Sequence, residues 1–317
     1  MSTAEARSAG STEQGPLLQV ENLAKRYRSR RALEGLSLTV RSGEIVGLVG
    51  ANGSGKTTSL RILAGLLAPD AGRGSVLGFD LLRDAREIRR HTGYMSQRFS
   101  LYAGISVREN LRFRAEVFGL QEPRGAVAAV VERFDLRSFE TLTAERLSGG
   151  WARLVQLAAA LVHAPRLVLL DEPTAGLDAA ARQAVWRHLA RLAAGGAAIV
   201  LSSHDLVDAS RCARISCLAQ GRVVRSGSPS DVALATRATV LAIRGGRVLG
   251  LIEPLQAVPG VIASYPSGDC LRVVIDPAVE AGIGGCTLLA DFVVERVSPT
   301  LEDAALEWSA SRRAVSR

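Results

Sequence analysis

The sequence contains few lysines and few aromatic residues, although it is strongly basic. Of its 39 lysine and arginine residues only Lys25 and Lys56 are lysines, and aromatic residues make up 4% of the 317 positions. So few aromatics exclude the alternation of aromatic and basic residues that is typical of single-strand nucleic-acid binding, and we expect no nucleic acid as a partner. We attribute the net charge of +8 to arginine spread over the surface; the alternative is a basic face toward nucleic acid or anionic lipid.

Long apolar runs and closely paired cysteines are also missing. No apolar run approaches the roughly 18–20 residues of a membrane helix, so we expect no direct membrane span. Residues 1–16 are small and polar and lack the apolar region of a signal peptide, which predicts a mobile N-terminal tail. The cysteines form no C-x-x-C pair, so we expect reduced thiols in a cytosolic protein. They are Cys212, Cys217, Cys270 and Cys286.

A glycine-rich segment, GANGSGKTT, begins at Gly50 and fits the phosphate-loop pattern G-x-x-x-x-G-K-[ST]. The apolar run before it, at 44–49, predicts a buried strand, and leucines at helical spacing after it predict a helix. In this context the backbone N–H groups of the loop point at phosphate oxygens beside a positive helix end. The predicted nucleotide-binding residues of this segment are Gly50, Ala51, Asn52, Gly53, Ser54, Gly55, Lys56, Thr57 and Thr58.

Two side chains of the loop have specific predicted roles. Lys56 is expected to bind the β- and γ-phosphates of ATP, and the Thr57 hydroxyl is expected to ligate Mg²⁺. The composition supports Lys56 independently, because a sequence so biased toward arginine still places a lysine here. A planar guanidinium and a compact ammonium are not interchangeable at such a position.

Two acids follow a second apolar run. The run at 167–170 is typical of a buried parallel strand, and it ends in Asp171 and Glu172. Because open α/β sheets bind ligands at the carboxyl ends of their strands, both carboxylates are expected beside the phosphates. We expect Asp171 to hold Mg²⁺, through water, and Glu172 to orient and polarise the attacking water. The two motifs together predict a phosphate-loop ATPase.

A third motif, LSGG at 147–150, lies between the other two, and with it residues 17–232 resemble the ATP-binding cassette family, the nucleotide-binding subunits of ABC transporters. Ser148 is a good helix N-cap, and leucines at helical spacing follow it. In this family the serine and glycines of LSGG grip the γ-phosphate bound to the partner subunit. The resemblance therefore implies that Ser148, Gly149 and Gly150 complete the nucleotide site of a second cassette.

Four further positions match the family one at a time. Tyr27 resembles the aromatic residue that stacks on adenine. Gln97 resembles the glutamine that touches Mg²⁺ or the water and moves when nucleotide binds, and residues 98–102 after it would contact a coupling helix of the membrane partner. Asp178 matches the aspartate that crosses the dimer interface, and His204 matches the histidine that hydrogen-bonds the γ-phosphate. The resemblance thus implies Glu172, His204 and Gln97 as catalytic residues.

The sequence departs from the family after LSGG. The family usually has glutamine there, whereas this chain has Trp151, and the next residues, 152–154, are less polar than expected. A similar tryptophan is found in a subgroup of exporter ATPases. We expect Trp151 to alter how this helix packs on its partner. The departure leaves Ser148, Glu172 and His204 intact, which favours a working ATPase.

The remaining pattern predicts how the cassette is organised. Alternating residues at 18–20 and 36–40 predict antiparallel strands, and residues 218–224 predict a hairpin that closes the cassette. Between them, Ser106 opens a capping box at the start of a helix. The resemblance places the helical subdomain, which faces the transporter, at about 98–165.

Residues 233–317 are predicted to form a separate small domain. The capping spacing of Thr300 and Asp303 predicts a terminal helix. This part resembles the accessory domain of exporter-type cassettes, implicated in dimer contacts or regulation. The whole chain is therefore predicted to be α/β: an ATP-binding cassette with a mostly parallel core sheet, an antiparallel β flank and a helical subdomain, plus a small α+β C-terminal domain. Candidate strands of that domain are 240–243, 248–251, 271–275 and 292–297.

The resemblance implies the ATP-hydrolysing subunit of an ABC transporter of the exporter-type subgroup, which handles multidrug or polysaccharide cargo. Such a subunit works with a separate transmembrane permease and a second cassette, as a homodimer or heterodimer, at the inner face of the plasma membrane. ATP between Lys56 of one chain and Ser148 of the other would close the pair, and hydrolysis would reopen it.

Two alternatives remain. One is a soluble cassette ATPase that acts on ribosomes or nucleic acid; translation-type relatives usually carry two cassettes, and repair-type relatives carry a coiled coil before LSGG. This chain has one set of motifs, and the segment 59–146 has no heptad run. The other is a non-hydrolysing regulatory cassette, against which the intact Glu172 and His204 argue.

Overall fold

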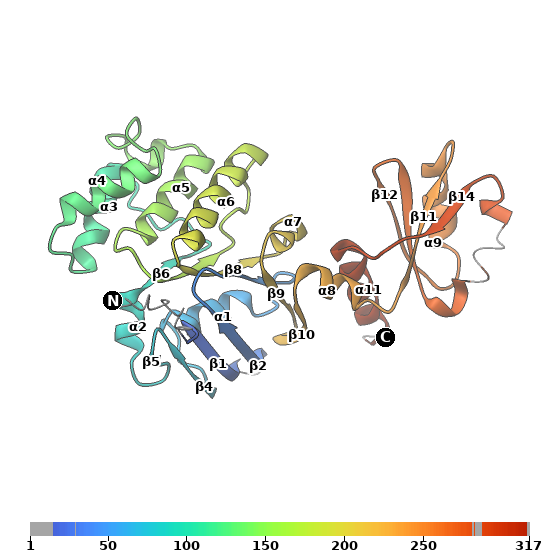
Figure 1. The fold of residues 1–317 in the computed structure, drawn as a ribbon, viewed down its shortest axis with the longest axis horizontal. Coiled ribbons are helices and arrows are strands. Elements are labelled where there is room, and N and C mark those ends of the chain that lie inside the picture. The colour runs from blue at the N-terminus through green and yellow to red at the C-terminus, as the bar shows by residue number, and fades with distance from the viewer. Residues whose placement is uncertain (1–14, 29, 281, 283–286, 316–317) are drawn as a thin grey trace, which may run out of the picture. The chain divides into compact units, whose positions relative to one another are not determined.

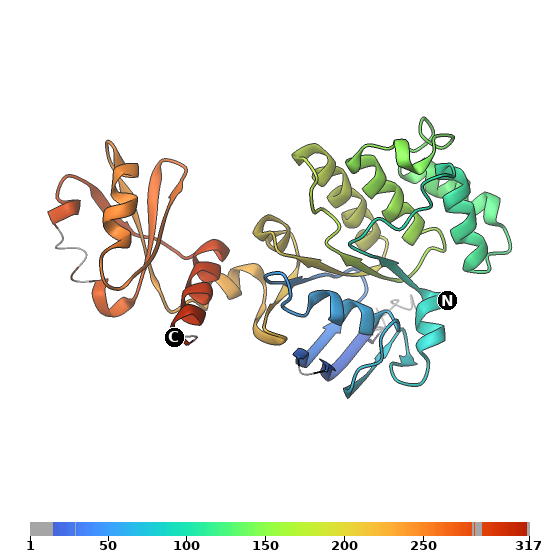
Figure 2. The ribbon, with the colours of Figure 1, turned by 180° about the vertical axis from the view of Figure 1, so that it is seen from behind.

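The computed structural model describes residues 15–28, 30–280, 282 and 287–315. The chain divides into two compact units, Met1–His204 with Leu218–Val223, and Asp205–Cys217 with Val224–Arg317 (Figure 1, Figure 2). Most of the predicted N-terminal tail, up to residue 14, lies outside the described residues. The domain boundaries expected from the sequence, at 16/17 and 232/233, stay predictions.

An antiparallel sheet forms the flank of the first unit, as predicted. Its strand order is β2-β1-β4-β5, and each neighbouring pair is antiparallel. In β1 and β2 buried apolar residues alternate with more exposed, mostly polar ones, because successive side chains of a strand point to opposite faces. The strands are β1 (Leu18–Tyr27), β2 (Arg30–Val40), β4 (Ala71–Val76) and β5 (Phe79–Asp80).

A second sheet, with the order β10-β9-β3-β8-β7-β6, contains the parallel core. The pairs β3–β8, β8–β7 and β7–β6 are parallel, which confirms the predicted core sheet. Every residue of β7 and β8 is buried, as expected for strands covered on both faces. The strands are β3 (Ile45–Val49), β6 (Thr92–Met95), β7 (Leu167–Asp171), β8 (Ala198–Ser203), β9 (Arg214–Ala219) and β10 (Arg222–Gly227).

Helix α1 (Lys56–Leu63) lies between these two sheets and contacts β2, β7 and β8 (Figure 1). Apolar residues of this helix join strand residues of both sheets in one core. The predicted hairpin turn between β9 and β10 is also observed, and its Gly221 N–H donates to the Ser54 carbonyl at 3.0 Å. The phosphate loop is therefore held between the helix and this turn.

Helices α3 to α6 gather on the opposite side of the parallel sheet, whereas α2 contacts β5 and β6 (Figure 1, Figure 2). The predicted capping box is confirmed: the Ser106 hydroxyl accepts from the Glu109 N–H, and the Glu109 carboxylate accepts from the Ser106 N–H. Helices α3, α4 and α5 fall within the predicted helical subdomain. The helices are α2 (Ala85–His91), α3 (Val107–Val117), α4 (Pro123–Arg133), α5 (Gly149–Ala160) and α6 (Ala179–Ala194), with a short 3-10 helix, η1 (Ala144–Arg146).

The second unit contains an antiparallel sheet with the order β12-β13-β11-β14 and its own apolar core. The predicted terminal helix is present, and its Thr300 and Asp303 cap each other through their side chains and N–H groups. The elements are α7 (Leu206–Ser210), α8 (Pro229–Leu234), β11 (Thr239–Arg244), η2 (Val248–Leu251), α9 (Ile252–Gln256), β12 (Val261–Ser267), β13 (Cys270–Ile275), η3 (Pro277–Val279), η4 (Thr287–Leu289), β14 (Val293–Arg296) and α11 (Leu301–Val315).

One predicted strand of this unit is wrong, and one strand was missed. Residues 248–251 form the 3-10 helix η2, because Arg247 takes a left-handed φ of 59° and its carbonyl accepts from the Gly250 N–H. Short apolar runs do not by themselves distinguish strand from helix. The missed strand, β12, contains Pro266, which a strand at the edge of a sheet tolerates because it lacks one neighbour.

Two further observations bear on the sequence expectations. Cys212, Cys217 and Cys270 are free thiols, and Cys286 lies outside the described residues. Within the ranges given above, no helix combines the length and the apolar character needed to cross a membrane.

Candidate functional site

The phosphate loop runs from the end of β3 to the first residue of α1. Gly55 precedes the helix with a φ of 111°, and a Cβ there would lie 2.6 Å from the Ala32 carbonyl oxygen. A Cβ on Gly50 would lie 2.3 Å from the Leu218 carbonyl oxygen. These close approaches of backbone to backbone explain why the loop needs glycine at both positions.

Lys56 is the first residue of α1, and its buried ammonium group points back into the loop. Its Nζ donates to the carbonyls of Gly50, at 2.7 Å, and Ala51, at 3.2 Å. The same Nζ lies 3.4 Å from Oε1 of Glu172, which is also buried. A buried charge is costly unless it is paired, and this pairing fixes both groups beside the loop.

The carboxylates of Asp171 and Glu172 are organised by the ends of β7 and β8. The Asp171 Oδ1 accepts from the Thr57 hydroxyl at 3.1 Å and from the Ser202 hydroxyl at 2.7 Å. The Ser202 hydroxyl also accepts from the Glu172 N–H at 2.9 Å, and Nδ1 of His204 lies 2.7 Å from Oε2 of Glu172. Parallel strands end at one edge of the sheet, so this network forms beside the phosphate loop.

A cavity of about 470 Å³ opens over these groups. Tyr27, which is 44% exposed, and Gln97 line this cavity together with loop residues and Glu172, the predicted catalytic acid. Much of the predicted site therefore lines one cavity. Its lining residues are Tyr27, Arg30, Ala32, Asn52, Gly53, Gly55, Lys56, Thr57, Thr58, Gln97 and Glu172.

The predicted residues around LSGG and Asp178 do not line this cavity. Ser148, just before α5, and Gly149, its first residue, are exposed, and the Ser148 side chain makes no capping hydrogen bond. Gly150 packs near the start of α6, where a Cβ would lie 3.1 Å from the Ala181 Cβ. Asp178 is exposed and caps α6 by accepting from the Ala181 N–H at 2.8 Å. Within one chain the site thus has two separate parts.

Comparisons with known proteins show the family of this chain. Residues 33–175 match a family model described as ABC transporter. A daunorubicin resistance ATP-binding protein of Streptomyces coeruleorubidus is 35% identical over 314 residues, which cover 94% of this chain and 97% of that protein. This chain belongs to the ABC transporter family.

Another relative is the probable multidrug ABC transporter ATP-binding protein YbhF of Escherichia coli, 34% identical over 218 residues. The match covers 68% of this chain but 38% of that protein, so the chain spans about two fifths of its length. Among solved structures, an ATP-binding subunit of an ABC transporter covers 68% of this chain and 91% of its own, at 32% identity and a TM-score of 0.62. A dimeric post-hydrolysis cassette bound to ADP and phosphate matches 67% of this chain and 98% of its own length, at 28% identity and a TM-score of 0.62.

The family and the cassette fold expected from the sequence are thereby confirmed, and the chain is an ATP-binding cassette of a family of ATPases. Three side chains of this cassette site were missed by sequence reasoning. Arg30 donates to the Gly53 carbonyl at 3.1 Å and lines the cavity. Ser202 joins both acids, and Arg153 reaches the backbone behind them. The available signals were weak: a serine ending an apolar strand, and an arginine in the segment that departs from the family pattern.

The electrostatics of the cassette site reflect its burial. Burial, and then the negative charge of Asp171, raise the pKa of Tyr94 above its usual value. Burial lowers the pKa of Arg153, and the charges of Asp171 and Glu172 oppose that shift. The acids thus stabilise a buried guanidinium behind them while the ammonium of Lys56 faces one of them in front.

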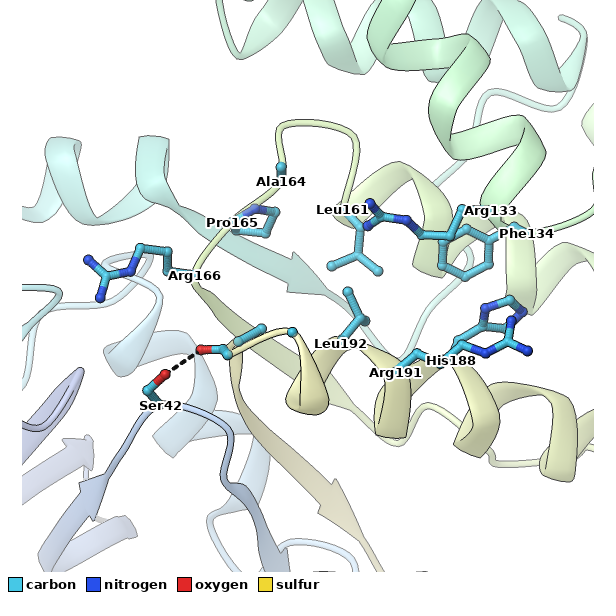
Figure 3. A pocket seen from close by; sticks show the side chains of 13 residues that line it. Ser42, Arg133, Phe134, Leu161, Ala164, Pro165, Arg166, His188, Arg191 and Leu192 are labelled. Atoms are coloured by element: carbon cyan, nitrogen blue, oxygen red, sulfur yellow. Dashed lines mark hydrogen bonds between the residues drawn. The ribbon is translucent and has the colours of Figure 1, made fainter. Parts of the chain in front are cut away.

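A second cavity of the cassette, of about 760 Å³, lies near the ends of α4, α5 and α6 (Figure 3). His188 stacks on Phe134 there, with ring centroids 4.2 Å apart, and the Ser42 hydroxyl donates to the Gly196 carbonyl at 2.7 Å. Arg133, Arg166 and Arg191 also line it, but none of the predicted site residues does. Most of the predicted phosphate-loop residues line the other cavity instead.

Proposed function

We propose that this chain is the ATP-hydrolysing subunit of an ABC exporter that works in pairs beneath a separate permease. The observation that carries the proposal is the split site: Lys56 and Glu172 line one cavity, with Asp171 bonded to Thr57 at its edge, while LSGG is exposed elsewhere on the same chain. A nucleotide in the cavity would meet the LSGG of a second cassette. The names of two relatives, which concern multidrug transport and daunorubicin resistance, support export.

In this proposal the cavity binds ATP through the loop backbone, with Tyr27 against adenine and Lys56 on the β- and γ-phosphates. The oxygen donors of Thr57 and Asp171, 3.1 Å apart, fit the preference of Mg²⁺ for hard ligands, and Gln97 lines the same cavity. Bound Mg²⁺ would neutralise developing charge on the phosphates. Ser202 holds the Asp171 carboxylate in place for this role.

Glu172 is the proposed general base. Its carboxylate, fixed between Lys56 at 3.4 Å and His204 at 2.7 Å, is placed to accept a hydrogen bond from the attacking water. His204, whose side chain is 53% exposed, orients that carboxylate from the solvent side and is free to reach a γ-phosphate. Ser148, Gly149, Gly150 and Asp178 would complete the site from the partner.

The surface after Gln97 supports docking to a permease. Phe99 and Tyr102 are 48% and 56% exposed, and large aromatic side chains so exposed are typical of interaction surfaces. We therefore place the coupling contact at residues 98–102. This arrangement puts the chain at the cytoplasmic face of the membrane, held there by the permease.

Copurification from solubilised membranes tests the proposal. We expect a polytopic membrane protein to copurify with the chain, and we expect the double variant Phe99→Ser with Tyr102→Ser to lose it. The double variant should still bind ATP, because neither residue lines the nucleotide cavity. Recovery of ribosomes or DNA in place of a membrane protein would favour the soluble alternative.

A further inference from the structure

Arg153, on the helix that follows LSGG, is buried directly behind the nucleotide site. Its guanidinium donates to the carbonyls of Gln97, at 2.9 Å, and Ser96, at 3.4 Å, on the segment that follows β6. It also donates to three successive carbonyls at the end of β7 and just beyond it, those of Asp171, Glu172 and Pro173. One side chain of α5 therefore joins the two segments that carry the proposed catalytic acid and the predicted glutamine.

The backbone of Glu172 explains why that contact matters. Glu172 has a left-handed φ of 53°, a conformation that residues with a Cβ rarely adopt and that persists only where the surroundings impose it. Its N–H donates to Ser202, and its carbonyl accepts from Arg153. The rotation of this peptide sends the carbonyl backward to Arg153 while the carboxylate faces Lys56 and His204 in front.

Gln156, one turn further along α5, completes the connection. Its Oε1 accepts from Arg153 at 3.1 Å, and its Nε2 donates to the carbonyls of Ser96, at 3.0 Å, and Arg98, at 2.8 Å. Both side chains are buried, Arg153 at 9% and Gln156 at 2% exposure. A guanidinium presents five donors in a rigid fork, which suits several carbonyls at once.

We propose that Arg153 is a positioning residue for ATP hydrolysis, which holds the Glu172 peptide in its left-handed conformation and ties it to the Gln97 segment. The inference rests on the proposed function, since it acts through Glu172 as general base. Without Arg153 the peptide of Glu172 relaxes toward an ordinary conformation, and the carboxylate moves away from the water it must orient. Because the same guanidinium holds Gln97, a shift of α5 displaces both segments together.

The test compares Arg153→Gln and Arg153→Lys with the wild-type chain in steady-state ATP hydrolysis. We expect kcat to fall about 10²-fold in Arg153→Gln with KM for ATP changed less than about threefold, because a displacement of about 1 Å suffices for such a loss. Arg153→Lys, which keeps a cation but fewer donors, should recover part of kcat. Arg86→Gln, on an exposed arginine of α2, is the matched control and should leave kcat unchanged.

A second background separates this inference from the role of Glu172. In a Glu172→Gln chain, Arg153→Gln should lower the residual rate no further, because residues that act as a unit are not additive. An equal fall in both backgrounds would overturn the inference while leaving Glu172 as base. If Glu172→Gln alone hydrolysed ATP at the full rate, Glu172 would not be the base, and this inference would be overturned as well.

A purely structural role predicts a different pattern. It would lower the melting temperature and the fraction of ATP-binding chains, while the surviving molecules keep a normal kcat. If Arg153→Gln does not fold, Gln156→Leu provides the measurement, since it removes the bonds to Arg153 and to the Gln97 segment. We expect a fall in kcat of about three- to tenfold with KM unchanged; an unchanged kcat in Gln156→Leu and Arg153→Lys would overturn the inference.

Discussion

The two parts of the proposed nucleotide site differ in how they are completed. Around the phosphate loop, Lys56, Asp171 and Glu172 are buried and bonded to one another, to neighbouring hydroxyl side chains or to backbone. At LSGG, Ser148 and Gly149 are exposed, and no atom lies within 4 Å of a Cβ built on Gly149. Buried polar groups must find partners during folding, whereas exposed ones stay available to a ligand or a second chain. The fold preorganises the first part, and in the proposed function a second cassette completes the other.

The largest expected effect comes from breaking the preorganised part at Glu172. Glu172→Gln keeps the shape of the side chain but removes the base, so hydrolysis should fall by about 10²- to 10⁴-fold. ATP binding should persist, and the variant should form a long-lived ATP-bound dimer. Hydrolysis assays and size-exclusion chromatography in ATP measure the two effects. A monomer in ATP with undiminished turnover would contradict both the base and the shared site.

Mixing variants tests whether the two parts meet across chains. Lys56→Ala and Gly149→Asp should each abolish hydrolysis in pairs of identical chains. A mixed pair keeps one intact site, so an equimolar mixture should recover about a quarter of the wild-type rate if the two sites act independently. The rate of ATP hydrolysis after mixing, or after coexpression, measures this recovery.

The control for that experiment is a chain with both substitutions. Mixed with either single variant it should recover nothing, because no pair then contains an intact site. Gly149→Asp is expected to fold, since there is open space around a Cβ at that position. A mixture of single variants that pairs but stays inactive would mean that each site is completed within its own chain.

A pH experiment examines a buried polar group beyond the opposite end of α5 from LSGG. His163, beyond the end of α5, stacks on Phe118 with ring centroids 3.6 Å apart, and burial lowers its pKa to about 4. The unfolded chain binds this proton near pH 6.5, so folding stability should fall as pH drops from about 7 to about 4, by up to about 3 kcal/mol. Chemical denaturation across this range should show a shallower fall in His163→Phe.

The smallest effect is expected at Trp151. The structure places its ring against Phe139 of the same chain, with centroids 4.1 Å apart, which accounts for its packing without a partner. Trp151→Gln should lower stability by about 1 kcal/mol and change hydrolysis less than about threefold. Thermal unfolding and ATPase assays measure both. A tenfold loss of hydrolysis with unchanged stability would mean that Trp151 acts at the dimer contact after all.

Sequence reasoning was strongest where one local pattern decides the structure. The phosphate loop depends on glycines at short spacing, the acids follow a continuous apolar strand, and the caps at Ser106 and Thr300 depend on residues three positions apart. It failed at 248–251, where a short apolar run fitted both strand and helix, and at β12, where Pro266 weakened the pattern. The roles assigned to individual site residues stay predictions.

The sequence by itself determined the family, two apolar strands of the parallel core and the phosphate-loop motif, because each depends on neighbours along the chain. Only the tertiary structure decided that Ser202 joins both acids and that Arg153 holds the carbonyl of Glu172. These contacts join residues 19 to 31 positions apart, and no local spacing encodes which buried carbonyl a guanidinium reaches. The packing of α5 against the ends of β6 and β7 determines which carbonyls Arg153 reaches.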